Sequence, residues 1–278
     1  MSGADAVGAI APGRLAVVTG AASGIGLAAA RAFATKGMHV ALVDRAGDAL
    51  DAAARDIEGA TAHALDVADP DAMVTLAEEL GEPPALLMNN AAIGAGGDVL
   101  AGVAAWRRLI DVNLMGVLHG VAAFAPAMIA GDAPGLIINT GSKQGITQPP
   151  GNTAYNVSKA GVKALTEGLA HSLREQTGER VTAHLLIPGY THTGMTAPNA
   201  TTPADKPNAA WSAEQVVNFM LAGVEAGDFY ILCPDNETTR EQDAKRIAWA
   251  AADVSENRPA LSRWHPAWKD AFARYMAE

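Results

Sequence analysis

The sequence predicts an α/β protein in which helices cover both faces of a doubly wound, parallel sheet of seven strands. Short apolar runs alternate with helical stretches up to residue 233, and such alternation is typical of parallel sheets. A glycine-rich turn follows the first run, and polar side chains follow several later ones. The 278 residues, of which 49% are hydrophobic, suffice for one large domain or two small ones. We expect a single domain over residues 1–278, with its core in 14–233.

Each expected element has a composition that suits it. The strands are short apolar runs that end at turn or polar residues, at 14–19, 38–43, 60–65, 84–88, 135–140, 181–187 and 229–233. The helices are the longer stretches between them, at 27–36, 47–57, 71–80, 100–130, 153–176 and 211–226. The crossovers between parallel strands should be right-handed.

A glycine-rich turn joins the first expected strand to the first helix and reads Thr19-Gly-Ala-Ala-Ser-Gly-Ile-Gly26. Glycine lets the backbone turn tightly and approach a ligand closely, while the helix N-terminus offers unpaired N–H groups and a positive dipole end to a pyrophosphate. The order of strand, turn and helix therefore predicts a dinucleotide-binding site. Its residues would be Gly20, Ser23, Gly24, Ile25 and Gly26.

Asp44 ends the second expected strand, about 20 residues beyond the glycines, as in dinucleotide-binding βαβ units. An acidic side chain at this place can accept hydrogen bonds from ribose hydroxyls and would repel a 2′-phosphate. Asp44 therefore favours NAD over NADP, although Arg45 follows directly and could offset part of the repulsion. A solvated loop aspartate is the alternative interpretation.

Polar residues also follow the third, fourth and fifth expected strands, at Asp66, Asn89-Asn90 and Ser142. In open α/β sheets ligands bind beyond the carboxyl ends of the strands, so we expect these side chains to surround one cleft. Asn113 stands in an otherwise apolar helical stretch. It must face solvent or find hydrogen-bond partners.

Tyr155 and Lys159 stand four residues apart in the stretch 142–159. On a helix they would share a face, which brings an ammonium beside a phenol. A free phenol has a pKa of ~10, and a nearby positive charge favours the phenolate, so the group becomes usable as an acid or base. The same spacing also arises by chance on many helices, and its interpretation depends on the upstream motifs.

Together these motifs resemble the short-chain dehydrogenase/reductase family over residues 14 to about 233. The motifs occur in the family's order: the glycine turn, Asp66-Val67, Asn89-Asn-Ala-Ala92, Asn113, Ser142, Tyr155-x-x-x-Lys159 and Pro188-Gly-Tyr-Thr-His-Thr193. The resemblance implies a Rossmann domain that interconverts a secondary alcohol and a ketone by hydride transfer with a nicotinamide cofactor. Ala92 and Gly141 depart from the family pattern, which often has Gly and Ser there. These departures put substrate fit in doubt.

The resemblance also implies a role for each matching residue. Tyr155 would transfer the proton, and Ser142 would hydrogen-bond the substrate oxygen. Lys159 would hold the nicotinamide ribose and lower the pKa of the phenol, while Asn113 would position a water in a proton relay. Further cofactor contacts would come from Asp66 at the adenine and Thr193 at the carboxamide, with Val67, Asn90, Tyr155, Lys159, Pro188, Gly189 and Thr191.

Two later segments do not belong to the expected strands or to the helices that cover the sheet. Residues 190–211 are rich in Thr, Pro, Asn and Ala, and we expect a substrate lid there, with a disordered surface loop as the alternative. Residues 234–278 form an extension that carries three of the five tryptophans, with expected helices at 238–252 and 266–277. About 45 residues are few for an independent core. We expect this extension to pack against the lid or against a partner subunit of a homodimer or homotetramer.

Charge and composition argue against several other classes of protein. The net charge of −10 and the pI near 5.1 disfavour nucleic-acid binding. No signal-peptide pattern opens the chain, polar residues and prolines interrupt its most apolar region, and Cys233 is its one cysteine. We therefore expect a cytoplasmic protein without membrane association. The histidines show no ligand-like pairing, so no metal is expected.

The leading interpretation is an NAD-dependent alcohol dehydrogenase or ketone reductase. The alternatives are an epimerase or dehydratase that uses NAD transiently and a nucleotide-binding module without catalysis. Ile93, Ile146, Tyr190 and the lid indicate an apolar or aromatic small-molecule substrate. A Ser-centred hydrolase is disfavoured because no Gly-x-Ser-x-Gly motif surrounds Ser142.

Overall fold

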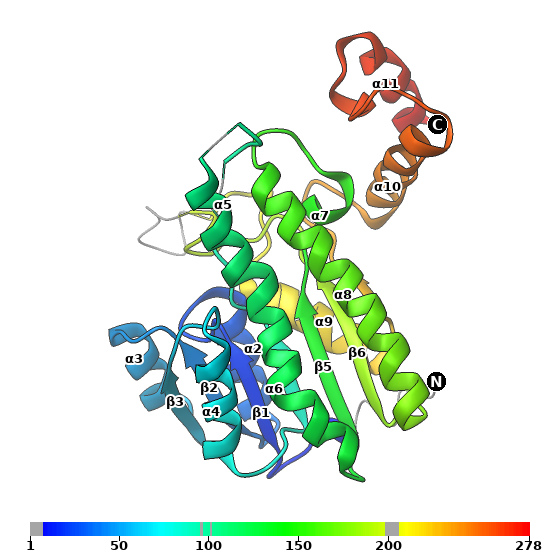
Figure 1. Cartoon of the computed structure of the whole chain (residues 1–278). Helices are drawn as coiled ribbons and strands as arrows, with labels where there is room; N and C mark the ends of the chain where they lie inside the picture. The colour runs from blue at the N-terminus through cyan, green and yellow to red at the C-terminus, as the bar shows by residue number, and fades with distance from the viewer. Residues whose placement is uncertain (1–7, 95–96, 101, 198–205) are drawn as a thin grey trace.

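A parallel sheet forms the centre of the computed structural model, which describes residues 8–94, 97–100, 102–197 and 206–278. Within these residues the sheet has seven strands in the order β3-β2-β1-β4-β5-β6-β7 (Figure 1). The strands are β1 (Leu15–Thr19), β2 (His39–Asp44), β3 (Ala60–Ala64), β4 (Leu86–Asn89), β5 (Gly135–Thr140), β6 (Val181–Ile187) and β7 (Tyr230–Leu232). The strand order reverses at β1, which pairs with both β2 and β4. The predicted doubly wound sheet is confirmed.

Helices cover both faces of the sheet because successive strand residues point to opposite faces. Ala16 and Val18 belong to the apolar cluster under α2 (Gly24–Thr35), α3 (Asp48–Asp56) and α9 (Ala213–Ala226). Leu15 and Val17 belong to the cluster on the other face. That face is covered by α4 (Pro70–Leu80), α6 (Gly116–Ala130) and α8 (Thr153–Thr177).

The stretch expected to be one helix over 100–130 is divided into three parts. It contains α5 (Val103–Ile110), a π-helical segment η1 (Asp111–Met115) and α6. The wider turn of a π segment changes the direction of the side chains that follow it, and such segments are frequent at functional sites. Asn113 lies within η1, and the sequence pattern alone did not indicate this interruption.

Residues Val103–Ala130 also form the one described helical stretch that is long and apolar enough to cross a membrane. Its apolar side chains have another use in this fold. Val112, Phe124 and Met128 are buried in the core cluster beneath the sheet, and such burial accounts for the hydropathy of the stretch.

The two ends of the segment 190–211 are hydrogen-bonded to each other through their backbones. The Trp211 N–H donates to the Tyr190 carbonyl at 2.8 Å, and the His192 N–H donates to the Trp211 carbonyl at 2.8 Å. The predicted substrate lid includes residues 198–205, which lie outside the described residues. The two ends of this segment therefore meet beside the end of β6, and the lid itself stays a prediction.

The C-terminal extension is helical and stands away from the sheet beyond α7 (Gln144–Thr147), as Figure 1 shows. It consists of α10 (Arg240–Ser255), α11 (Lys269–Ala277) and the 3₁₀ turns η3 (Ser262–Trp264) and η4 (Pro266–Trp268). Trp249 is buried in the extension, where its ring contacts Trp268, Phe272 and Tyr275. Its indole N–H donates to the Ser262 hydroxyl at 2.7 Å. These aromatic contacts give the extension a small core of its own.

Candidate active site

A cleft of about 700 Å³ opens at the carboxyl ends of β1, β2, β4, β5 and β6. Most of the residues that the sequence singled out line it: Gly20, Ser23, Gly24, Ile25, Asp44, Asp66, Val67, Asn90, Tyr155, Lys159, Pro188, Thr191 and Thr193. Four others, Gly26, Asn113, Ser142 and Gly189, are not among the lining residues. The parallel sheet explains the gathering, because all its strands end at one edge.

The glycine turn forms a cradle that only glycine can make. Gly20 and Gly24 have positive φ angles of 67° and 56°, a conformation that other residues adopt at a cost. A Cβ on Gly26 would lie 2.1 Å from the Gly20 carbonyl oxygen, so Gly26 allows α2 to start directly against the turn. No side chain caps the N-terminus of α2, and its first turn has no acidic residue. The open, positive end of this helix fits a pyrophosphate.

Asn90 connects the glycine turn to the neighbouring strands. Its side-chain amide donates to the Thr19 carbonyl at 3.1 Å, and its carbonyl oxygen accepts from the Thr140 hydroxyl at 3.3 Å. The Thr19 hydroxyl in turn accepts from the Asn90 N–H at 2.9 Å. These contacts hold the ends of β1, β4 and β5 in one arrangement, so Asn90 shapes the cleft that it lines.

Two carboxylates mark the side of the cleft at β2 and β3. The Asp44 carboxylate accepts from the Ala22 N–H at 3.0 Å and from the Arg45 N–H at 2.8 Å. Asp66 accepts from the Ala68 N–H at 3.0 Å and pairs with Arg108 at 2.7 Å. Burial by itself would raise the pKa of Asp66, but these hydrogen bonds and the arginine charge outweigh burial, so its pKa is lowered. Both groups are therefore held as oriented carboxylates.

Lys159 is buried at the other side of the cleft. Its Nζ donates to the Thr140 carbonyl at 2.7 Å and lies 5.9 Å from the centre of the Tyr155 ring. Burial lowers the pKa of Lys159 to about 8, because a charged ammonium is poorly solvated there. The pair of residues thus shares one face of α8, as their spacing predicted.

The pKa of Tyr155 differs from the expectation. Burial raises it, and the hydrogen bond with the Ser142 side chain opposes that effect only in part. The net pKa shift of this phenol is upward, and the expected contribution of Lys159 stays a prediction. Lys159 faces the ring while donating to Thr140, and the upward shift comes from the loss of water around the phenolate.

Ser142 is placed by the short helix α7. Its hydroxyl oxygen accepts from the Gln144 N–H at 3.2 Å, and its carbonyl accepts from the Gly145 N–H at 3.0 Å. A Cβ on Gly145 would lie 2.5 Å from the Lys159 carbonyl carbon. Gly145 therefore allows α7 to rest directly on α8, which brings Ser142 to Tyr155. The sequence analysis missed this glycine, although it stands within the stretch 142–159.

Asn113 is fully buried and finds hydrogen-bond partners rather than solvent. Its carbonyl oxygen accepts from the Ile93 N–H at 2.8 Å, and its amide donates to the Ile93 carbonyl at 2.9 Å. The amide also lies 3.4 Å from the Ser158 hydroxyl. Asn113 thus holds the loop after β4 against α8, and its expected part in a water relay stays a prediction.

The segment after β6 completes the cleft. Pro188, Thr191 and Thr193 line it, and a Cβ on Gly24 would come within 3.2 Å of the Thr193 methyl group. Gly189 packs closely against the backbone of Pro234, because a Cβ on Gly189 would lie 2.8 Å from the Pro234 carbonyl oxygen. The 188–193 motif therefore contacts the glycine turn on one side and the start of the C-terminal extension on the other.

The comparison with known proteins agrees with this geometry, since residues 14–204 match the family model described as short chain dehydrogenase. The chain belongs to the short-chain dehydrogenase/reductase family. Galactitol 2-dehydrogenase (L-tagatose-forming) of Cereibacter sphaeroides is 40% identical over 191 residues, which are 66% of this chain and 74% of that enzyme. The 1-deoxy-11-beta-hydroxypentalenate dehydrogenase of Streptomyces exfoliatus is 31% identical over 265 residues, 90% of this chain and 94% of that enzyme.

The fold is also that of solved members of the family. A short chain dehydrogenase/reductase from Burkholderia phymatum, in complex with NAD, has a TM-score of 0.78 and 30% sequence identity. The similarity covers 89% of this chain and 96% of that chain. This dehydrogenase/reductase is therefore an oxidoreductase that acts on CH–OH groups, interconverts a secondary alcohol and a ketone, and uses a nicotinamide cofactor.

Several residues of the dehydrogenase/reductase site were not predicted. Arg108 on α5 and Met195 line the cleft, but each stands far in sequence from the motif it approaches. No sequence signal marks Arg108 as the partner of Asp66. Among the described residues, no group of three His, Cys, Asp or Glu side chains could hold a metal ion.

Proposed function

We propose that Tyr155, Ser142 and Lys159 carry out the proton transfer of an NAD-dependent dehydrogenase. The observation that carries this proposal is that Tyr155 and Lys159 line the cleft that the glycine turn also lines, while the Ser142 side chain is hydrogen-bonded to Tyr155. The nicotinamide cofactor supplies or accepts the hydride when bound. The Tyr155 hydroxyl gives the matching proton to a ketone oxygen or takes it from an alcohol, while the Ser142 hydroxyl hydrogen-bonds the same oxygen.

We infer that Lys159 orients both the cofactor ribose and the phenol. Its ammonium has one hydrogen-bond partner in the described residues, the Thr140 carbonyl, and an ammonium can donate three hydrogen bonds. The remaining two N–H groups support ribose binding. With a pKa of about 8, Lys159 also gains and loses its own proton close to physiological pH.

The preference for NAD is supported by the position of Asp44. Two backbone N–H groups orient its carboxylate at the end of β2, where ribose hydroxyls are recognised. Two unit charges about 5 Å apart repel by about 3 kcal/mol at an effective dielectric constant near 20, equivalent to about a hundredfold in affinity. Arg45 also lines the cleft and offsets part of this repulsion. We expect kcat/KM with NAD to exceed that with NADP by about 10- to 100-fold.

The substrate we propose is a compact alcohol or ketone with a largely apolar skeleton. Ile93 and Met195 line the cleft near the end of the cofactor site, and Ile146 lines the neighbouring pocket at α7. Tyr190 is half exposed at the start of the predicted lid. These side chains favour carbon-rich molecules because apolar contact stabilises their removal from water.

The experiment that tests this function is a panel of cyclic and aromatic secondary alcohols, with NAD and NADP in parallel. Net formation of NADH, followed by its absorbance, is expected with at least one alcohol. An epimerase or dehydratase would convert its substrate without accumulating NADH. Binding of NADH without any turnover across the alcohols and their ketones would contradict the proposal and support a nucleotide-binding module.

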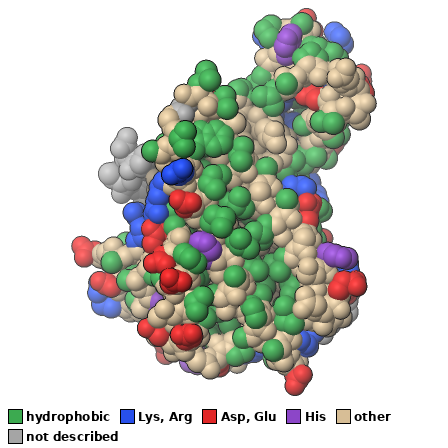
Figure 2. All heavy atoms as spheres, viewed as in Figure 1, with side chains coloured by type: hydrophobic (Ala, Val, Ile, Leu, Met, Phe, Trp, Pro, Cys, Tyr) green, Lys and Arg blue, Asp and Glu red, His purple; other side chains and the backbone are tan. Residues whose placement is uncertain are grey.

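We also propose that the enzyme is a cytoplasmic homo-oligomer, a dimer or a tetramer. Figure 2 shows hydrophobic side chains over the face where α6 and α8 lie. Leu118 on α6 and Val157 on α8 are 40% and 44% exposed, and apolar patches of this kind support subunit contacts. Light scattering after size-exclusion chromatography tests the oligomeric state, and a monomer would contradict it.

A further inference from the structure

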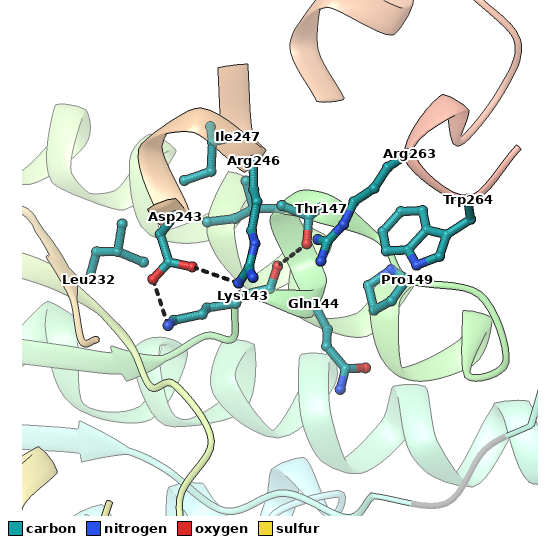
Figure 3. Close-up of a pocket in the computed structure, with 11 residues that line it drawn as sticks. Lys143, Gln144, Thr147, Pro149, Leu232, Asp243, Arg246, Ile247, Arg263 and Trp264 are labelled. Carbon is teal, nitrogen blue, oxygen red and sulfur yellow. Dashed lines mark hydrogen bonds and ion pairs between the residues drawn. The ribbon is translucent and has the colours of Figure 1, made fainter. Parts of the chain in front are cut away.

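A second pocket of about 260 Å³ lies between α7 and the C-terminal extension. Figure 3 shows Lys143, Gln144, Thr147 and Pro149 on one side of it and side chains of α10 and η3 on the other. Thr140 and Gly141 line the cofactor cleft, whereas Lys143 and Gln144 line this pocket. Along the chain only Ser142 separates the two cavities.

The pocket contains more positive than negative charge. Lys143 pairs with Asp243 at 2.6 Å and with Asp235 at 3.4 Å, and Arg246 lies 3.8 Å from Asp243. Arg263 adds a third cation to these two carboxylates, and no carboxylate pairs with it among the described residues. One positive charge at the pocket is therefore left without a counterion.

The two arginines point into this pocket from different elements. Figure 3 shows the guanidinium of Arg263, from η3, beside Thr147, and that of Arg246, from α10, beside Asp243 and Lys143. The Nε atom of Arg246 is buried without a hydrogen-bond partner in the described part of the chain. Burial first and the charge of Arg246 second lower the pKa of Arg263. A buried donor and two neighbouring like charges are unfavourable unless an anion joins them.

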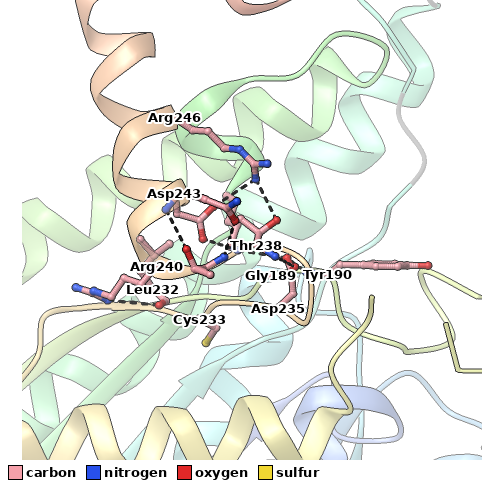
Figure 4. A network of polar contacts seen from close by, with 12 residues as sticks. Gly189, Tyr190, Leu232, Cys233, Asp235, Thr238, Arg240, Asp243 and Arg246 are labelled. Carbon is pink, nitrogen blue, oxygen red and sulfur yellow. Dashed lines mark hydrogen bonds and ion pairs between the residues drawn. The ribbon is translucent and has the colours of Figure 1, made fainter. Parts of the chain in front are cut away.

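The same polar network reaches the start of the predicted lid. In Figure 4 Asp235, Thr238, Asp243 and Arg246 lie together beside Gly189 and Tyr190. The Asp235 carboxylate accepts from the Tyr190 N–H at 3.3 Å, and the Arg246 guanidinium donates to the Thr238 hydroxyl at 3.1 Å. The polar network beside the pocket therefore joins the extension to Tyr190 and, through Lys143, to the turn that carries Ser142.

We propose that this pocket binds a carboxylate of the substrate through Arg263 and Arg246, so that the enzyme acts on hydroxy and keto carboxylic acids. The inference rests on the proposed function and specifies its substrate class. A planar guanidinium matches a carboxylate in a bidentate hydrogen-bonded pair. The walls formed by Ile146, Leu232, Ile247 and Trp264 suit the carbon skeleton that carries the acid.

The two cavities are neighbours along the chain, because Gly141 lines the cofactor cleft and Lys143 lines the pocket. The Cα atoms of Gly141 and Lys143 are two residues apart, and two residues span at most about 7 Å. We infer that a small cyclic acid whose oxygen is held at Ser142 reaches Arg263 across this short separation. The Arg263 guanidinium lies over the rings of Trp264 and Phe272, 4.7 and 5.3 Å from their centres, and a neutral substrate would leave it without a counterion.

The test compares 4-hydroxycyclohexanecarboxylate with its methyl ester as substrates, in the wild type and in Arg263→Gln, Arg263→Lys and Arg274→Gln. The wild type is expected to prefer the acid by at least about tenfold in kcat/KM, because a hydrogen bond to a charged group contributes about 1.5–3 kcal/mol. Arg263→Gln is expected to lower this preference about 10- to 100-fold, mainly through KM for the acid. Arg263→Lys should restore part of it. Arg274 is exposed on α11, and its substitution should leave the preference as it is.

A binding measurement separates this inference from the proposed function. Cyclohexanecarboxylate, which has no hydroxyl to oxidise, is titrated against tryptophan fluorescence, since Trp264 lines the pocket. Saturable binding that weakens about tenfold or more in Arg263→Gln supports the carboxylate site even if no alcohol is oxidised, in which case the proposed function alone fails. Absent saturable binding, an unchanged dissociation constant in Arg263→Gln, or a wild-type preference for the ester refutes the site.

Discussion

The contact between Gly145 and α8 gives the sharpest test of how this active site is assembled. In Gly145→Ala the new Cβ would lie 2.5 Å from the Lys159 carbonyl carbon, whereas ordinary contacts begin near 3.4 Å. Backbone atoms of α8 cannot move aside as a side chain can, so α7 must shift by about 0.9 Å, the difference between these two values. Ser142 stands two residues before the start of α7 and should shift with it, away from Tyr155.

The expected effect falls on turnover more than on cofactor binding. A misplacement of about 1 Å at a reacting group can reduce the rate about a hundredfold, and overpacking should lower the free energy of unfolding by about 1–3 kcal/mol. Gly145 does not line the cofactor cleft, so the dissociation constant for NADH should stay within about threefold of the wild-type value. Steady-state kcat, thermal unfolding and NADH fluorescence titration measure the three quantities.

Gly168→Ala is the matched control. Gly168 lies on α8, the helix that Gly145 contacts, and a Cβ there would meet nothing within 4 Å. This variant should keep the wild-type kcat and gain about 0.5–1 kcal/mol of stability from helix propensity. The steric account would be refuted by a Gly145→Ala enzyme with wild-type kcat and unfolding temperature. It would also be refuted if both variants lost activity equally.

Three further predictions address the proton transfer, the cofactor preference and the buried lysine. Tyr155→Phe should lower kcat about 10²- to 10⁴-fold while NADH still binds in a fluorescence titration, and near-normal turnover would exclude Tyr155 as the proton donor. Asp44→Ser should lower the ratio of kcat/KM for NAD over NADP about 10- to 100-fold; an unchanged ratio would show that Asp44 does not select the cofactor. Burial lowers the pKa of Lys159 from 10.5 to about 8, so between these pH values the unfolded chain holds a proton that the folded chain has lost. Stability from this group therefore rises from pH 8 to 10.5, and the unfolding temperature of the wild type should rise relative to that of Lys159→Met over this window. A constant difference would contradict the lowered pKa.

The C-terminal extension helps to hold the turn that carries Ser142. Lys143 follows Ser142 directly and is held by Asp243 on α10 and by Asp235 after β7. Burial raises the pKa of Asp243, although Lys143 and Arg246 oppose this effect. One buried ion-pair network therefore joins the Ser142 turn to residues that lie nearly 100 positions later. A ligand anion at Arg263 would act directly on this network.

Sequence periodicity predicted the central strands closely because they are buried along their whole length. Each residue of β5 and β6 is buried, and apolar runs bounded by turn residues mark such strands. The long helix over 100–130 was predicted less well, since a π segment has no distinct periodicity over five residues. The helix α7 was missed for a similar reason, because four residues are too few to show a pattern.

The sequence predicted those site residues whose type is explained by their local position, either a backbone conformation that favours glycine or the end of a strand. Gly20 and Gly24 have positive φ angles, and Asp44 and Asp66 follow strands of a parallel sheet. Arg108 and Arg263 could not be found in this way. Their partners lie on distant segments, and a single arginine in a helix or a turn has no pattern that points to them.

The sequence by itself determined the family, the succession of strands and helices along the chain and most of the residues that line the cleft. These features follow from hydrophobic periodicity, glycine geometry and the spacing of polar residues at strand ends, all of which can be read along the chain. The tertiary structure decided the raised pKa of Tyr155, the pairing of Arg108 with Asp66 and the pocket lined by Arg263. Each of these depends on burial and on charges from segments far apart in sequence, and folding alone brings such segments together.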